Sequence, residues 1–135
     1  MKRTISSSGD VQGLGELLNG ASVDRSRFAL DGGALCLELE LTRACLELKT
    51  SVRRGFVTRT RVPWMKSRLT LEQVTAVVVL RVSDALPQEQ PVLLCEPAAV
   101  GYRVIVTNHD GLQLHLTMTQ LAGIFEDIGK PIDPP

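Results

Sequence analysis

The sequence predicts a mainly β protein, a small antiparallel β-roll or partly open barrel of about seven strands closed by one C-terminal amphipathic helix. The first observation behind this prediction is strict alternation of apolar and polar residues over residues 34–41, the two-residue period of a half-buried strand. The second is a pair of alternating runs, 102–107 and 112–118, around a turn sequence. The third is a change to helical spacing after Met118.

The alternating segment at residues 34–41 follows a tight-turn sequence. Asp31, Gly32 and Gly33 tolerate the positive φ angles that a hairpin turn requires. Leucines then occupy one strand face, while a cysteine and two glutamates occupy the other, because successive side chains point to opposite faces. The apolar face consists of Leu35, Leu37, Leu39 and Leu41, and the opposite face of Cys36, Glu38 and Glu40.

Three further segments before the last hairpin have the composition of strands. Residues 46–49 alternate between leucine and charged residues, residues 56–62 contain threonines, and residues 75–82 are rich in β-branched side chains. Pro63 lacks a backbone donor, so the second of these strands should end, or lie at a sheet edge, next to it. Two prolines in residues 84–91 predict a loop.

The C-terminal part of the chain predicts a β-hairpin followed by a helix. Residues 102–107 and 112–118 flank the turn sequence Asn108-His109-Asp110-Gly111. After the hairpin, Thr119 can cap a helix, and glycine, lysine and proline at residues 129–131 form a stop signal. The apolar face of the expected helix comprises Leu121, Ile124, Phe125 and Ile128.

The sequence divides into a flexible start, one domain and a tail. Residues 1–26 are rich in serine and glycine, contain one weak helical turn around Leu14, and are expected to be flexible. Residues 27–130 should form a single domain, and residues 131–135 an extended tail. The 15 basic and 15 acidic side chains cancel, so the whole molecule generates no strong field toward nucleic acid or an anionic membrane.

Compartment signals favour a cytoplasmic protein. The N-terminal residues lack the apolar segment of a secretory signal, and no stretch approaches the roughly 20 apolar residues of a transmembrane helix. Cys36, Cys45 and Cys95 lie in apolar runs and are expected to be buried reduced thiols. A bridge between Cys36 and Cys45 is the alternative.

Two passages carry a resemblance to a known family. The letters SRLTLEQVTAV at residues 67–77, within the segment 61–82, resemble the strand and L-x-x-V-x-x-V passage of bacterial pleckstrin-homology-like (PH-like, or GRAM-like) domains. Residues 102–129 stand where such domains have their last hairpin and closing helix, whereas residues 1–26 have no clear counterpart. The resemblance implies a β-roll with a closing helix and a non-catalytic binding or scaffolding role.

A run of basic residues without an acidic residue lies between Glu47 and Glu72. Arg59 and Arg61 alternate onto one strand face, in a spacing that resembles the basic strand pairs with which pleckstrin-homology domains bind inositol phosphates. Arginine matches the geometry of phosphate groups, and Trp64 could insert at a membrane interface or stack on a base. The candidate ligand-binding residues are therefore Arg53, Arg54, Arg59, Arg61 and Trp64. The run also contains Lys49, Lys66 and Arg68.

A structural role is the alternative for these arginines. They could solubilise a sheet edge by pairing with glutamates on neighbouring strands, namely Glu38, Glu40 and Glu47. Trp64 would then lie at the rim of the core.

No catalytic or metal-binding arrangement can be recognised in the sequence. His109 fits turn chemistry, and a metal shared with His115 would need a third ligand that the sequence does not indicate. We therefore expect no cofactor, no metal and no catalytic residue. The expected function is a non-catalytic binding or scaffold module with a protein partner or a second copy of the chain.

Two alternative functions remain open. The first is binding of an anionic lipid headgroup, a phosphate ligand or nucleic acid through residues 53–68, although the balanced net charge disfavours nucleic acid. The second is a small-ligand-binding barrel or an enzyme of unknown chemistry.

Overall fold

A computed structural model describes residues 1–31, 33–81, 92–108 and 111–132 of the chain, and strands dominate these residues. The predicted mainly β class is therefore confirmed. The described elements, in chain order, are β1 (Lys2–Ile5), α1 (Ser8–Leu17), β2 (Ser22–Asp31), β3 (Ala34–Ala44), the 3-10 helix η1 (Leu46–Leu48), β4 (Thr50–Arg54), β5 (Val57–Arg61), β6 (Trp64–Arg81), β7 (Leu93–Pro97), β8 (Tyr102–Thr107), β9 (Leu112–Met118) and β10 (Gly123–Ile132).

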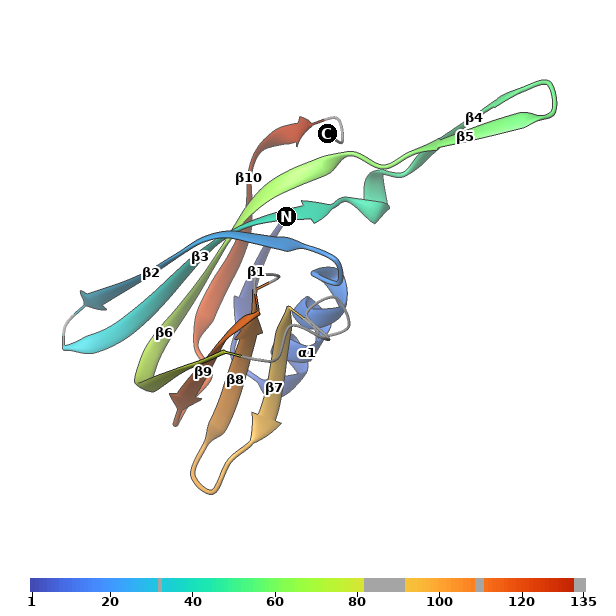
Figure 1. Cartoon of the computed structure of the whole chain (residues 1–135). Coiled ribbons are helices and arrows are strands. Elements are labelled where there is room, and N and C mark those ends of the chain that lie inside the picture. Colours follow the sequence, from blue (N-terminus) through green and yellow to red (C-terminus); the bar gives the residue numbers. More distant parts are fainter. Residues whose placement is uncertain (32, 82–91, 109–110, 133–135) are drawn as a thin grey trace.

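The long strand β6 organises the main sheet because it has neighbours along both edges. On one edge it pairs with β3, which pairs in turn with β2. Along the other edge, β10 lies beside the first half of β6 and β9 beside the second half. β1 flanks β10, and β8 and β7 continue the sheet beyond β9, with every pairing antiparallel (Figure 1).

The sheet bends near the middle of β6. Gln73 has a positive φ of 59°, and the pairing of β6 with β9 shifts register between Val74 and Ala76. Beside the bend, the Glu72 N–H donates to the carbonyl of Ala122 at 2.8 Å. The two resulting leaves form a half-barrel, and α1 contacts β7 in one leaf and β1 in the other (Figure 1).

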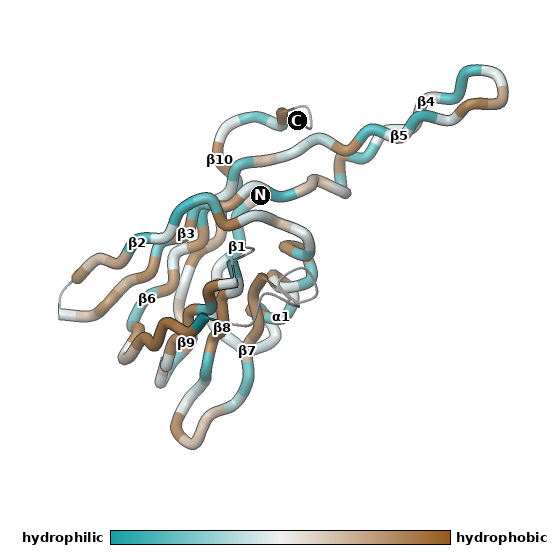
Figure 2. Tube along the Cα trace, viewed as in Figure 1, coloured by the Kyte–Doolittle hydropathy of each residue, from teal (hydrophilic) through white to brown (hydrophobic). Residues whose placement is uncertain are grey.

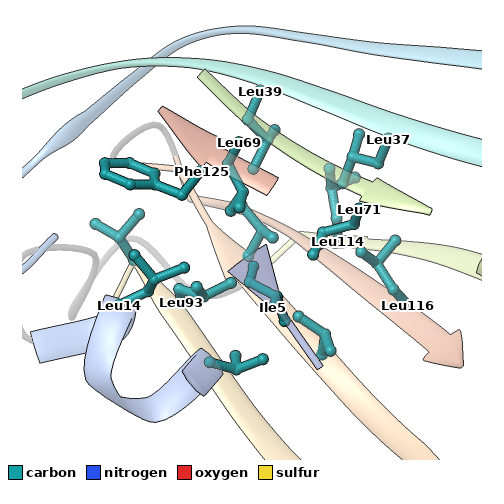
Figure 3. Packing of buried hydrophobic residues seen from close by; sticks show 14 of the residues in the cluster. Ile5, Leu14, Leu37, Leu39, Leu69, Leu71, Leu93, Leu114, Leu116 and Phe125 are labelled. Carbon is teal, nitrogen blue, oxygen red and sulfur yellow. The ribbon is translucent and has the colours of Figure 1, made fainter. Parts of the chain in front are cut away.

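Apolar side chains from both leaves and from α1 form one core (Figure 3). The leucine stripe of β3 that the sequence predicts lies in this core, with Leu37, Leu39 and Leu41 almost fully buried. The helix contributes Val11 and Leu14. Burial of such side chains on one face of a sheet is the dominant favourable term in folding, so α1 stabilises the half-barrel by covering this face.

The predicted C-terminal helix is wrong, because residues 123–132 form the strand β10. The spacing that suggested a helix also fits a period of two, with Gly123 and Phe125 buried and Ile124 between them less buried. β10 is hydrogen-bonded on both sides, to β1 and to β6, and this pairing outweighs the local helical preference. Gly129, with a φ of 77°, lies at an irregularity in the pairing with β6 and does not cap a helix.

Other elements differ from the expectation near the middle of the chain. Residues 46–48, predicted to be a strand, form the 3-10 helix η1, because the Leu48 N–H bonds back to the Cys45 carbonyl at 3.0 Å. β7 was not predicted, and the described residues contain ten strands in place of about seven. The expected loop at 84–91 and His109 lie outside the described residues.

Residues 1–26, which the sequence assigns to a flexible segment, contain β1, α1 and the start of β2. The predicted helical turn around Leu14 is part of α1. Serines at its start cap the helix, since the Ser7 hydroxyl accepts from the Asp10 N–H and the Asp10 carboxylate accepts from the Ser7 N–H. Ile5 and Leu18 are buried in the core. The structure therefore places this segment within the same core as residues 27–130.

The close approach of α1 to β7 yields a testable prediction. A Cβ added at Gly15 would lie 2.6 Å from the backbone oxygen of Leu93, whereas one added at Gly13 would meet no atom within 4 Å. We expect Gly15→Ala to lower the free energy of unfolding by about 1–3 kcal/mol, because the helix must move away from β7. Gly13→Ala should raise it by about 0.5–1 kcal/mol through helix propensity. Urea unfolding of both variants checks this, and equal effects would contradict the packing described.

Candidate functional site

Between Ala44 and Trp64 the chain leaves the main sheet and forms a separate two-stranded sheet of β4 and β5. We call residues 50–61 the arm, and Figure 1 shows that it extends away from the half-barrel. Arg54 pairs with Val57, so the turn has only two residues, and its first, Gly55, has a φ of 63°. A glycine at this position is what a two-residue hairpin turn requires.

The register of the arm places its arginines on both faces. Residues directly opposite in an antiparallel pair share a face, and successive residues alternate. Arg59 and Arg61 therefore share one face, as the alternation predicts, and Arg54 joins them because its partner is Val57. Arg53 lies on the other face, and its Nε donates to the carbonyl of Gly55 at 3.2 Å. The hydroxyl residues Ser51, Thr58 and Thr60 share the face of Arg53.

Two of the three glutamates that the structural alternative pairs with these arginines have other partners. Glu38 lies 3.0 Å from Arg27 and 3.2 Å from Arg68, and Glu47 bonds Arg43. Across the part of the chain that the structure describes, Arg53, Arg54 and Arg59 make no ion pair, and all three are exposed. For these three arginines, pairing with the glutamates is therefore wrong.

The outer end of the arm is apolar. Phe56 is fully exposed at 103%, and Val57 next to it is 58% exposed. Figure 2 shows the hydrophobic residues at this end following the hydrophilic residues of β4. The end of the arm therefore presents an uncovered aromatic side chain beside cationic ones.

Trp64 does not lie on the arm. It begins β6 where the chain rejoins the main sheet, opposite Ala44 and Ile132, and it is half-buried. Lys66 and Arg68 also belong to the main sheet, where Lys66 bonds Asp24 at 3.1 Å and Arg68 contacts Glu38. The structure thus brings four of the five candidate residues together on the arm and leaves Trp64 at its base.

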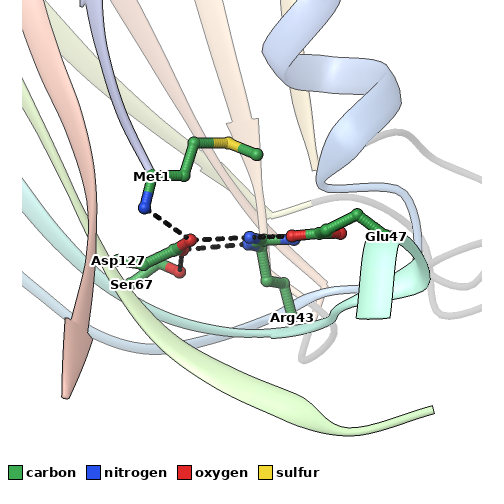
Figure 4. Close-up of polar contacts among 5 residues, drawn as sticks. All are labelled: Met1, Arg43, Glu47, Ser67 and Asp127. Carbon is green, nitrogen blue, oxygen red and sulfur yellow. Dashed lines mark hydrogen bonds and ion pairs between the residues drawn. The ribbon is translucent and has the colours of Figure 1, made fainter. Parts of the chain in front are cut away.

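A buried polar network, which the sequence analysis missed, holds the base of the arm (Figure 4). Arg43, only 1% exposed, donates to both oxygens of Asp127 at 3.0 and 2.7 Å and to Glu47 at 2.6 Å. The Ser67 hydroxyl donates to Asp127 at 2.7 Å, and the N-terminal amine lies 3.5 Å from the same carboxylate. The backbone N–H of Cys45 donates to the Pro63 carbonyl at 2.8 Å.

This network connects the strands on either side of the arm. Arg43 is the penultimate residue of β3, Glu47 lies in η1 just before β4, and Ser67 lies near the start of β6. All are linked to Asp127 of β10, either directly or through Arg43. The base of the arm is thereby fixed to the half-barrel by charge-assisted hydrogen bonds, the strongest class in proteins.

The network keeps its carboxylates ionised. Burial alone would raise the pKa of Asp127, but hydrogen bonds from Arg43 and Ser67 hold it below its ordinary value. The hydrogen bond from Arg43 likewise lowers the pKa of Glu47. Since a lowered carboxyl pKa stabilises the folded state above the ordinary pKa, this stabilisation is present at neutral pH and lost in acid.

The other features that the sequence analysis considered offer less chemistry. The three cysteines are reduced thiols and the alternative Cys36–Cys45 bridge is not formed, but the expected burial is confirmed only for Cys45. Cys45 is buried, whereas Cys36 and Cys95 are only half-buried, and burial raises the pKa of the Cys45 and Cys95 thiols. In residues 1–31, 33–81, 92–108 and 111–132, no group of three histidine, cysteine or acidic side chains is arranged to hold a metal ion. A shallow groove lies between α1 and β7, lined by Gln12, Glu16, Asn19, Leu94 and Cys95.

Comparison with known proteins does not indicate a function, so the function is inferred from the structure of the arm. No family model matches the chain, and neither the curated proteins nor the solved structures gave a match. None of the described helices is long and apolar enough to cross a membrane.

Proposed function

We propose that this chain is a non-catalytic binding module that contacts an anionic partner through the arm. The observation that carries the proposal is the exposure of Arg53, Arg54 and Arg59 without an acidic partner among the described residues. Guanidinium groups donate in a fixed fork that matches carboxylate and phosphate oxygens. The PH-like resemblance supports the same class of function, since it implies binding or scaffolding.

The energetics of the arm also support a binding role. A two-stranded hairpin is at best marginally stable in water, and ordering its residues costs conformational entropy. None of the arm residues whose burial the structure describes belongs to the hydrophobic core, so core burial of these residues does not offset this cost. A partner that pairs with the arginines would supply stabilisation that the half-barrel does not.

A protein scaffold role at another edge is the second candidate. β2 pairs only with β3 within the described residues, and Phe28 and Leu30 on it are exposed. Such an edge can accept a strand from a partner or from a second copy of the chain. Light scattering over a range of concentrations tests self-association, and a strict monomer would exclude it.

The arm proposal is tested by removing charge from the arm and from the body in equal amounts. The arm variant is Arg53→Gln/Arg54→Gln/Arg59→Gln, and its control is Arg3→Gln/Arg25→Gln/Arg81→Gln, which removes three exposed arginines elsewhere. On immobilised heparin, used as a general polyanion, we expect the arm variant to bind about tenfold or more weakly than the wild type. Salt should weaken the wild-type interaction because exposed charges are screened.

The control variant should keep most of the wild-type retention on heparin. Equal losses in the two variants would show that binding follows total charge and would contradict a role for the arm. A wild-type chain that heparin does not retain at low salt would contradict the proposal as well.

A further inference from the structure

We propose that the anionic partner is a lipid bilayer with acidic headgroups, contacted end-on by the arm, with Phe56 and Val57 inserted at the headgroup level. This inference rests on the proposed function and adds the identity of the partner. The apolar end of the arm is the observation behind it, because binding of an anion by the arginines would not require Phe56 and Val57 to be exposed.

The turn geometry presents Phe56 as the outermost large side chain of the arm. The two-residue turn at Gly55 and Phe56 reverses the chain, so neither strand extends past it. Phe56 is fully exposed and is not part of the described core, and Val57 is more than half exposed. Transfer of these two side chains from water into an apolar environment is favourable, and phenylalanine is among the residues that segments lying in a membrane interface bury at the boundary with the acyl chains.

The arginines stand directly behind this apolar end. Arg53 and Arg54 precede Gly55, and Arg59 follows Val57 by two residues. At about 3.3 Å per residue, the backbone positions of these three arginines lie within roughly 7 Å of Val57 along the strands. A bilayer surface has the same order, with phosphates above the boundary that an apolar side chain can enter. The aliphatic part of an arginine side chain can also extend, so that its guanidinium group stays at the level of the phosphates.

The distribution of charge favours contact through the end of the arm. Residues 49–61 hold five basic side chains and no acidic one, so the rest of this neutral chain has five more acidic than basic side chains. Five strand residues span about 17 Å, which exceeds the roughly 8 Å screening length at physiological salt. An end-on arm therefore keeps the acidic excess of the body away from a negative surface.

The same features favour a bilayer over nucleic acid. A DNA duplex accepts an apolar side chain between base steps only at the cost of unstacking them, and an unpaired base can stack on Phe56 but offers Val57 no apolar site. A bilayer offers that site along its whole surface, and clustered arginines are attracted by acidic headgroups. The pair of exposed apolar residues at the end of the arm is thus better matched by lipid.

The test uses the full chain and vesicles of phosphatidylcholine, with or without phosphatidylserine. We expect sedimentation with phosphatidylserine vesicles, and a loss of affinity of about tenfold or more in Phe56→Ser. The matched control is Val100→Ser, which removes an apolar side chain that is 71% exposed but lies away from the arm. It should bind as the wild type does, and thermal melts of both variants should match the wild type because both residues are exposed.

Insertion is measured directly with one fluorophore. In the variant Phe56→Trp/Trp64→Phe, the single tryptophan at the end of the arm should shift its emission to the blue with phosphatidylserine vesicles. Brominated acyl chains should quench it. Unchanged emission on vesicles that bind the protein would overturn insertion.

The outcomes separate this inference from the proposed function. If Phe56→Ser binds vesicles as well as the wild type while the triple arginine variant does not, insertion fails and anionic contact stands. If the wild type binds heparin and a DNA duplex but not phosphatidylserine vesicles, the lipid partner is excluded and the anionic contact again stands. If none of these probes is bound, both fail.

Discussion

Replacement of Arg43 by methionine is expected to lower the free energy of unfolding by about 3–5 kcal/mol, the cost of breaking a buried ion pair by removing one partner. Asp127 is only 6% exposed in side-chain area and would keep Ser67 and the N-terminal amine as its remaining partners. The buried carboxylate would thus lose two charge-assisted hydrogen bonds. Urea unfolding, with the slope compared between variants, measures the change.

The control for Arg43→Met is Arg103→Met, since Arg103 makes an ion pair with Glu96 on the surface. That pair should contribute less than about 1 kcal/mol. The double variant Arg43→Met/Asp127→Leu should be more stable than Arg43→Met alone, because it leaves no unpaired charge at Asp127. Equal effects of Arg43→Met and Arg103→Met would contradict the buried network. The wild type should also lose stability in acid more steeply than Arg43→Met, because the variant lacks the hydrogen bonds from Arg43 that lower the pKa of Asp127 most.

Phe125→Ala is expected to cost about 3–5 kcal/mol of unfolding free energy, the usual result of emptying a buried aromatic site. Phe125 is fully buried among the leucines of β3 and β6 (Figure 3). Its ring also lies 6.0 Å from the Arg43 guanidinium carbon, so the change removes a cation–π contact next to the network. Thermal or urea unfolding checks this expectation.

Ile128→Ala is the matched control, because the helix predicted from the sequence places Ile128 and Phe125 on the same buried face. In the strand β10 the two residues lie on opposite faces, and Ile128 is 37% exposed. We expect a cost of about 1 kcal/mol or less for Ile128→Ala. Equal large losses for both variants would support a helix at residues 121–128 and contradict β10.

The parts of the fold predicted correctly are those in which local pattern and local pairing agree. Turn residues and alternation were sufficient for the β8–β9 hairpin and for β3 with the turn before it, because these segments are adjacent in sequence. β2 was not predicted as a strand, and it begins within the segment that was expected to be flexible. The prediction for the residues of β10 was wrong because the strands that pair with β10, β1 and β6, are distant in sequence. Its apolar residues fit two periods over a short length, and only non-local pairing decides between them.

In the candidate site, too, local features were predicted correctly and features that depend on distant strands were not. Alternation placed Arg59 and Arg61 on one face, but it could not show that the hairpin leaves the main sheet, which depends on β6 pairing with β3 and β10. The network at the base of the arm had one overlooked signal. Arg43 continues the leucine face of β3 two residues after Leu41, and a charged residue on an apolar face requires a buried partner. The sequence did not indicate that Asp127 is this partner, because the expected helix hid it.

Amide hydrogen exchange with and without heparin shows which part of the molecule contacts the polyanion. The amides of residues 50–61 should become protected when heparin binds, because a partner would order a hairpin that is marginally stable alone. The amides around the groove between α1 and β7 should exchange as before. Protection at that groove, with exchange in the arm unchanged, would contradict binding through the arm.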